Sequence, residues 1–272
     1  MLRNLLPRRV RAAVASLAFC LALSAASQAR AETEVDVALV LAVDISFSMS
    51  MEELTLQRDG FVDAFRSREV QNAIENGLTG RIAVTYMEWA GVAGHAVLAP
   101  WTVIEDAAGA VAFSAVIEAQ PTRRMRRTSI SAAIDRSMDL LADSGVFAIR
   151  EVIDISGDGV NNEGRPVEAA RDAALDRGVI INGLPIMIER HGAFDIANLD
   201  AYFVDCVIGG PGAFVIPVRE PEQFAEAIRR KLVLEIAGIT PEPDLVRRAD
   251  DSSPIDCLIG EKLWMQRRGF TP

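Results

Sequence analysis

The residues best suited to chemistry lie in one short segment, Asp44-Ile45-Ser46-Phe47-Ser48, in which three oxygen-bearing side chains alternate with apolar ones. One carboxylate and two hydroxyls are hard oxygen donors, which suit Mg²⁺, Mn²⁺ or Ca²⁺ better than zinc. The segment also suits a helix start, because Ser48 or Ser50 precedes Glu52 and Glu53 as in a capping box. Both roles can hold at once, and the pattern by itself does not establish a metal site.

Two further oxygen donors stand where they would meet this segment. Thr128 precedes an expected helix over 129–141, and Asp158 follows an expected strand over 150–156. Ligands of open α/β sheets bind in the crevice at the carboxyl ends of the strands, so we expect these donors to share one rim with Asp44. The sequence therefore predicts a divalent-cation site made of Asp44, Ser46, Ser48, Thr128 and Asp158.

The elements that must carry these residues alternate along the chain. Residues 35–43 form a nearly continuous apolar run, typical of a strand buried on both faces of a parallel sheet. Further strands are expected over 81–89, 96–103, 150–156, 179–185 and 213–218, and helices over 51–65, 105–119, 129–141, 166–177, 195–206 and 221–236. This alternation predicts an α/β fold with a doubly wound, mostly parallel six-stranded sheet flanked by helices. Pro100 suits an edge strand, so 96–103 is expected as an antiparallel edge.

The two ends of the chain differ in composition from the part between them. Residues 1–31 combine a basic start, an apolar run and an Ala29-Arg30-Ala31 cleavage pattern, which is typical of a secretory signal peptide. The apolar run is short for a membrane span, and bulky Phe19 before Cys20 disfavours a lipoprotein signal. We therefore expect a periplasmic or secreted protein without a transmembrane anchor after cleavage, a domain over 32–237, and a tail over 238–272 with one short helix that could dock on the domain.

Charge and cysteine content narrow the choice of partners and compartment. The net charge is −10, and loss of residues 1–31 would remove five basic residues and no acidic one. Because the chain is this acidic, nucleic acid and anionic lipid repel it, and we expect no nucleic-acid partner. Cys206 and Cys257 would remain, and outside the cytosol they can pair and staple the tail to the domain. Two separate buried thiols are the alternative.

The order and spacing of Asp44-Ile45-Ser46-Phe47-Ser48, Thr128 and Asp158-Gly159 resemble the metal-ion-dependent adhesion site (MIDAS) of von Willebrand factor type A (VWA) domains. The resemblance covers roughly residues 35–236, and the segments 158–162 and 207–214 further resemble a bacterial group of exported proteins, DUF1194. It implies that the serines and the threonine contact an ion, that the two aspartates hold it largely through water, and that one position stays open for an acidic group of a partner. Mg²⁺ is the expected ion, with Mn²⁺ or Ca²⁺ as alternatives.

Two flanking features allow two interpretations each. Asn161 and Asn162 depart from the simplest family pattern, and they either orient waters in a second shell or shape the turn. The arginine run beside Thr128 either steers an acidic partner to the ion or is a solvated loop. Its members are Arg123, Arg124, Arg126 and Arg127.

An enzyme is the main competing hypothesis. Phosphoryl-transfer enzymes with a similar sheet often carry Asp-x-Asp after the first strand, but Ser46 replaces the second acid here, and the G-x-S-x-G and P-loop motifs are absent from the sequence. A metal-assisted phosphoester hydrolase and a purely structural ion remain as alternatives. The sequence favours an exported, divalent-metal-dependent binding or adhesion module that captures an acidic group of a protein partner and is not an enzyme.

Overall fold

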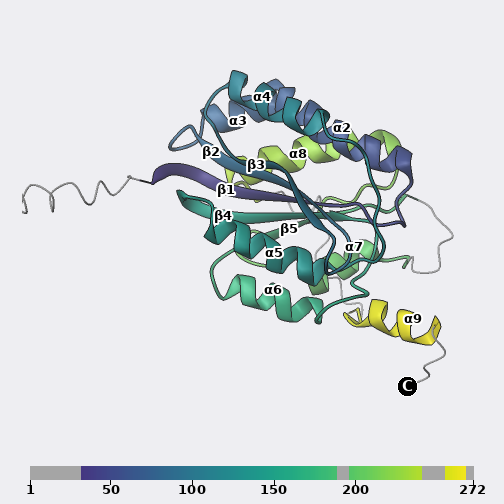
Figure 1. Ribbon diagram of the computed structural model, residues 1–272. Helices are drawn as coiled ribbons and strands as arrows, with labels where there is room; N and C mark the ends of the chain where they lie inside the picture. Colours follow the sequence, from purple (N-terminus) through teal and green to yellow (C-terminus); the bar gives the residue numbers. More distant parts are fainter. Residues whose placement is uncertain (1–31, 189–195, 241–254, 268–272) are drawn as a thin grey trace, which may run out of the picture. The chain divides into compact units, whose positions relative to one another are not determined.

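The computed structural model describes residues 32–188, 196–240 and 255–267 (Figure 1). The chain divides into two units, 1–33 and 34–272, and the features below belong to the second unit, apart from the first residue of its first strand. The expected signal peptide lies outside the described residues. Within the described ranges, no helix combines the length and apolar character that a membrane crossing requires.

A five-stranded sheet lies at the centre, in the order β3-β2-β1-β4-β5 (Figure 1). The strands are β1 (Thr33–Asp44), β2 (Ile82–Trp89), β3 (His95–Ile104), β4 (Val146–Gly157) and β5 (Ile180–Pro185). β1 runs parallel to β2 and β4 runs parallel to β5, whereas β3 pairs antiparallel with β2 at the edge. The α/β class and the antiparallel edge strand predicted around Pro100 are therefore confirmed.

The predicted sixth strand, over 213–218, is wrong. This segment runs beside β5, where the Gly183 amide donates to Phe214 O at 3.0 Å and the Ile216 amide donates to Gly183 O at 3.1 Å. It nevertheless forms only isolated bridges, at Val215 and Val218. The ladder is interrupted at Pro185 of β5, which has no N–H to donate to this segment, whereas Ile216 and Val218 both donate to β5.

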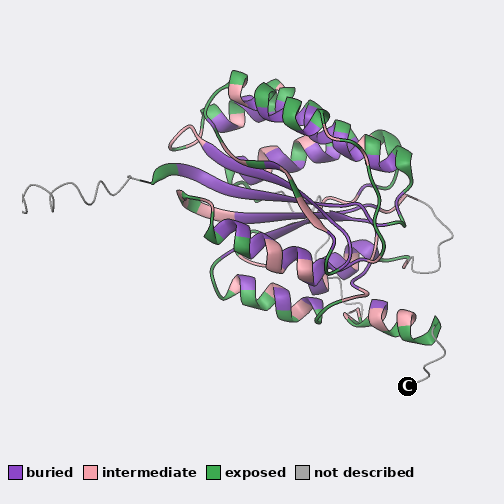
Figure 2. Cartoon of the chain, in the orientation of Figure 1, coloured by how far each residue is buried: buried purple, intermediate pink, exposed green. Residues whose placement is uncertain are grey.

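Helices cover both faces of the sheet (Figure 1). One buried core lies under α2, α3, α4 and α8, and the other lies under α5, α6 and α7. β1 supplies both cores, because Leu39 and Leu41 point into the first while Val40 and Ala42 point into the second. Figure 2 shows β1 buried along nearly its whole length, as the continuous apolar run predicted. The bounds are α2 (Met51–Arg66), α3 (Arg68–Glu75), α4 (Ala107–Glu118), α5 (Ile130–Ala142), α6 (Val167–Leu175), α7 (Leu199–Tyr202) and α8 (Phe224–Ala237).

The helix predicted over 195–206 is shorter and of mixed type. It begins at Leu199 as α7 and continues as a π-helix, η1 (Phe203–Val207). Before α8 the chain makes one 3₁₀ turn, η2 (Pro221–Gln223). After the residues that are not described, the tail forms α9 (Ile259–Arg267).

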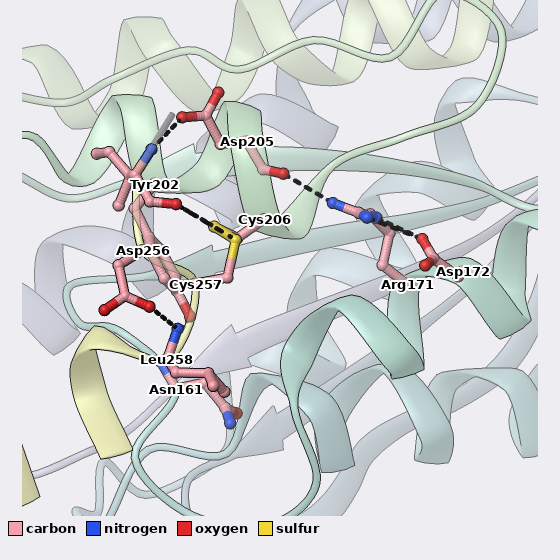
Figure 3. The surroundings of a disulfide bond; sticks show 10 residues. Asn161, Arg171, Asp172, Tyr202, Asp205, Cys206, Asp256, Cys257 and Leu258 are labelled. Carbon is pink, nitrogen blue, oxygen red and sulfur yellow. Dashed lines mark hydrogen bonds and ion pairs between the residues drawn. A yellow bond between two sulfur atoms is a disulfide. The ribbon is translucent and has the colours of Figure 1, made fainter. Parts of the chain in front are cut away.

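A disulfide ties this tail to η1. Cys206 and Cys257 are bonded with an S–S distance of 2.00 Å (Figure 3). Beside it, the amide of Ile255 donates to Asp205 Oδ2 at 2.9 Å. Residues 255–257 are thus held by one covalent bond and one charge-assisted hydrogen bond.

Candidate metal site

Asp44 stands at the carboxyl end of β1 and is fully buried. Its Oδ1 accepts a hydrogen bond from the backbone amide of Ser46 at 2.7 Å. Its other oxygen, Oδ2, is buried and has no hydrogen-bond partner among the described residues. A buried carboxylate oxygen without a partner is costly unless a cation or a proton satisfies it.

The electrostatics of Asp44 point the same way. Burial raises the pKa of Asp44 well above its ordinary value, and the nearby carboxylate of Asp158 raises it further. Ser46 and the backbone of Asp158 lower this pKa and do not cancel these effects. Two carboxylates that each disfavour the other's charge gain the most from a shared cation.

Ser46 and Ser48 bring their hydroxyls to the same place. The two Oγ atoms lie 2.8 Å apart, and the Ser48 hydroxyl donates to Asp158 Oδ1 at 2.7 Å. The Ser46 hydroxyl makes a longer hydrogen bond to the same oxygen, at 3.4 Å. Residues from two segments that are more than a hundred positions apart therefore form one oxygen cluster.

The role of helix capping falls to another serine. Ser50 is the N-cap of α2, where its hydroxyl accepts from the Glu53 amide while the Glu53 carboxylate accepts from the Ser50 amide at 2.7 Å. This is the reciprocal pattern of a capping box. Ser48 is therefore not needed as the cap, and its hydroxyl is directed to the oxygen cluster.

Thr128 lies beside the turn that follows Asp158. Its amide donates to Asn162 Oδ1 at 3.1 Å, and the Asn162 amide donates back to Thr128 O at 2.9 Å. A Cβ atom at Gly159 would lie 3.7 Å from Thr128 Oγ1, so the hydroxyl sits beside this turn. Asn162 thus joins the Thr128 loop to the Asp158 turn through these two hydrogen bonds.

Backbone hydrogen bonds join the Thr128 loop to the Asp44 segment and to the end of β2. The Met125 amide donates to Ile45 O at 2.9 Å, and Ser129 donates through its amide to Ala90 O at 2.7 Å. Gly157 makes room for Asp44, because a Cβ there would lie 2.9 Å from Asp44 Oδ2. The structure therefore places all five predicted ligands at the carboxyl ends of β1 and β4 and in the loop before α5.

Three of the four arginines beside Thr128 are engaged within the chain. Arg123 Nε donates to Glu88 at 2.8 Å, Arg124 donates to Met49 O at 2.8 Å, and the guanidinium of Arg127 lies 3.5 Å from the ring centroid of Trp264. Arg126 is exposed, and within the described part of the chain its side chain forms no hydrogen bond or ion pair. Of the four, Arg126 is therefore the one whose guanidinium has no such contact among the described residues.

Sequence reasoning missed the buried anchor of this loop. Glu88 near the end of β2 is 1% exposed and pairs with Arg58 of α2 at 2.9 Å as well as with Arg123. Arg58 also donates to Thr122 Oγ1 at 3.1 Å, so it reaches the loop directly. The signal that could have found this pair is an acidic residue at an otherwise apolar strand position, which needs a buried cation.

Asp154 does not belong to the site. It lies within β4 and pairs with Lys231 of α8 at 2.8 Å, and Lys231 also contacts Glu235. All three side chains are buried. They join α8 to the sheet, so Asp154 is paired in the core.

Comparison with solved structures defines the class of protein. The chain matches a von Willebrand factor type A protein from Catenulispora acidiphila with a TM-score of 0.51 and 13% identity, over 75% of this chain and 43% of that one. At that identity the likeness shows the fold, which is that of a VWA domain, as the sequence resemblance predicted. More particularly, the family model described as "Protein of unknown function (DUF1194)" matches residues 34–240, and the chain belongs to that family.

Two further solved structures, a mussel byssus protein and a pilus adhesin, match the same fold. Proximal thread matrix protein 1 from the mussel byssus, solved with a zinc-occupied MIDAS motif, gives a TM-score of 0.56 at 14% identity, over 76% of this chain and 49% of that one. The pilus adhesin SpaC from Lactobacillus rhamnosus GG gives 0.54 at 13% identity, over 76% and 31%. This chain thus spans about half the length of the mussel protein. The comparison with curated protein sequences found no match.

Proposed function

We propose that this protein is a divalent-metal-dependent binding module whose ion is held by Asp44, Ser46, Ser48, Thr128 and Asp158. The observation that carries the proposal is Asp44 Oδ2, a buried carboxylate oxygen without a hydrogen-bond partner among the described residues. A Cβ at Gly157 would intrude on this oxygen, and the same carboxyl group lies near Asp158, which accepts hydrogen bonds from the hydroxyls of Ser46 and Ser48. A cation bound there would satisfy the orphan oxygen and offset the repulsion between the aspartates.

The chemistry of the donors indicates what such an ion would recognise. Three of the five donors are neutral hydroxyls, so a bound divalent ion would keep much of its charge and attract an anionic ligand. Hard oxygen donors favour Mg²⁺, with Mn²⁺ and Ca²⁺ as alternatives, although zinc in the mussel protein's site makes zinc a necessary comparison. We propose that the ligand is an acidic side chain of a protein partner, as suits a fold shared with a pilus adhesin and a byssus protein.

Export is part of the same proposal. The disulfide between Cys206 and Cys257 suits an oxidising compartment, as the leader-like residues 1–31 do. We place the binding domain over 32–237 and a tail over 238–272, so that the mature protein acts in the periplasm or outside the cell. An adhesive role requires this location, because the protein must meet a partner that lies outside the cytosol.

Metal binding is the first test. Mg²⁺, Mn²⁺ and Zn²⁺ are titrated by calorimetry into the wild type, into Asp44→Ala and into Asp139→Ala, whose exposed carboxylate lies on α5 away from the cluster. We expect binding by the wild type and the Asp139 variant and none by the Asp44 variant. Equal binding by all three would contradict the proposed site, and unfolding of the wild type on chelation, with no partner present, would instead support a structural ion.

Partner capture is the second test. Immobilised wild type and Asp44→Ala are incubated with proteins of the cell envelope, with Mg²⁺ or with chelator. We expect a protein retained by the wild type only with Mg²⁺ and released by chelator or by free carboxylate at high concentration. Retention that ignores both chelator and the Asp44 substitution would argue against a metal-dependent mode of binding. Phosphoester turnover that disappears in Asp158→Ala would support the hydrolase alternative.

A further inference from the structure

The tail helix α9 packs directly on the turn that follows Asp158. Glu261 Oε1 accepts a hydrogen bond from Asn161 Nδ2 at 2.7 Å. Gly260 is buried, and a Cβ atom there would overlap Asn161 O and lie 2.7 Å from a methyl group of Val160. The approach is so close that glycine is required at this point of the helix.

Asn161 also contacts the start of α5, directly after the loop that carries Thr128. It is fully buried, and its Oδ1 accepts from the Ser131 amide, in the first turn of α5, at 3.1 Å. Its own amide donates to the Tyr202 hydroxyl at 3.1 Å. The carboxamide of Asn161 therefore lies between α9 on one side and the start of α5 on the other. A change in the position of Glu261 would move the turn between Asp158 and Asn162 relative to Thr128.

A second contact reaches the residue directly before Thr128. Arg127 has a positive φ of 76°, a backbone conformation that non-glycine residues seldom adopt and that persists only where the surroundings enforce it. Its guanidinium stacks on the ring of Trp264 in α9, 3.5 Å from the centroid. The tail thus holds the side chain of the residue that directly precedes Thr128 and has this unusual backbone.

The tail cannot diffuse away from these contacts. The disulfide from Cys206 to Cys257 begins four residues before Glu261, and Figure 3 shows Cys257, Leu258 and Asn161 in one neighbourhood. A covalent tether converts docking of the short helix into an intramolecular event with a high effective concentration. The family match ends at residue 240, so the tail residues 255–267 lie outside the part of the chain that the family model describes.

We propose that residues 255–267 are a positioning part of the site, with Glu261 and Trp264 as its positioning residues. Glu261 sets the turn that carries Asp158 through Asn161, and Trp264 sets the loop that carries Thr128 through Arg127. The tail thereby fixes the spacing between two ligands that come from different loops. The consequence for metal affinity rests on the proposed function, whereas the positioning of the two loops does not.

The experiment compares Glu261→Ala, Glu261→Gln, Trp264→Ala and the control Gln266→Ala in the full chain, Gln266 being exposed on the same helix. Amide hydrogen exchange over 125–131 and 158–163 is measured without metal, and Mn²⁺ affinity is measured separately. We expect faster exchange in both loops for Glu261→Ala and Trp264→Ala, and an affinity about 10-fold to 100-fold lower, as for other outer-shell partners. Glu261→Gln keeps an oxygen acceptor for Asn161 and is expected to restore most of both properties.

Cys257→Ser provides a second route to the same result, because it releases the tether without touching Asn161. It is expected to speed exchange in both loops while β1 and β4 keep their protection. Unchanged exchange in both loops for Glu261→Ala and Cys257→Ser would overturn the inference, and so would an equal effect of Gln266→Ala. If the loops respond as expected but the wild type binds no Mn²⁺, the positioning role is supported and the proposed metal function fails.

Discussion

The Ser48 hydroxyl donates a 2.7 Å hydrogen bond to Asp158 Oδ1, across 110 positions of the sequence. The contact is possible because β1 and β4 are neighbours in the sheet, so the segments that follow them meet at one edge. It joins the first and last parts of the proposed metal site in a single bond. Because several oxygen atoms are crowded here, we expect substitutions at this point to change both metal binding and folding stability.

Replacing Asp44 with asparagine tests the effect of this residue on metal binding separately from its effect on folding stability. The carboxamide would keep an oxygen for the Ser46 amide but would remove a buried charge that Asp158 disfavours, since burial and Asp158 both raise the pKa of Asp44. We therefore expect Asp44→Asn to lose divalent binding and to be at least as stable as the wild type in chelator at pH 7. Urea unfolding with and without Mn²⁺ measures both effects. A variant that is strongly destabilised in chelator would show that the carboxylate is needed by the fold itself.

Two neighbouring glycines provide a matched pair of substitutions. A Cβ at Gly157 would lie 2.9 Å from Asp44 Oδ2 and 3.3 Å from the Trp89 ring, whereas one at Gly159 would meet Thr128 at an ordinary 3.7 Å. We expect Gly157→Ala to cost about 1–3 kcal/mol of unfolding free energy, as overpacking does, and to weaken metal binding. Gly159→Ala is expected to change both much less. Chemical denaturation and metal titration of the two variants check this, and equal effects would refute the assigned geometry.

The arginine loop is expected to divide into structural and binding members. Glu88 is buried between Arg58 and Arg123, so Glu88→Ala leaves Arg58 without its carboxylate and is expected to cost about 3–5 kcal/mol. Arg126→Ala is expected to stay within about 0.5 kcal/mol of the wild type. Once a partner is known, the same Arg126 variant should slow association at low salt and have little effect at high salt. A large loss of stability in Arg126→Ala would contradict the absence of a side-chain partner for Arg126 among the described residues.

The buried cluster on α8 predicts a pH dependence of stability. Burial and the nearby Asp154 raise the pKa of Glu235 from an ordinary 4.5 to about 8, although Lys231 and Asn182 favour its charged form. A carboxyl group whose pKa is raised on folding holds a proton more tightly in the folded state. Its contribution to stability is therefore complete below about pH 4.5 and is lost as the pH rises to about 8.

Glu235→Gln tests this directly, because glutamine mimics the protonated acid. We expect the wild type to lose stability relative to the variant between pH 5 and 8, with a slope of at most about 1.4 kcal/mol per pH unit from this one group. Glu226→Gln, an exposed position on the same helix, serves as the control and should run parallel to the wild type. Urea unfolding across this pH range is the measurement, and parallel curves for Glu235→Gln and the wild type would show that Glu235 does not titrate as stated.

Local patterns determined most of the fold and the residues of the candidate site. The apolar run before Asp44 has the length and continuity of a buried strand, and the capping sequence at Ser50 marks the start of α2, so both could be predicted from neighbours in the sequence. The prediction of a sixth strand over 213–218 failed because an apolar pattern does not show where the ladder is interrupted, here at Pro185 of β5, which has no N–H to donate. Periodicity records which side chains are apolar, and it does not record which backbone groups find partners.

Tertiary structure alone decided which charged groups meet. The sequence places Arg123 in the run before Thr128, but only the packing of α2 against β2 brings Arg58 and Glu88 to that loop and pairs Arg123 with a buried carboxylate. The sequence likewise allowed a disulfide between Cys206 and Cys257, but not that α9 would place Glu261 on Asn161. Hydrogen bonds and ion pairs act over a few ångströms, so their partners are set by the three-dimensional path of the chain, whereas strand and helix signals act between sequence neighbours and are legible in the sequence itself.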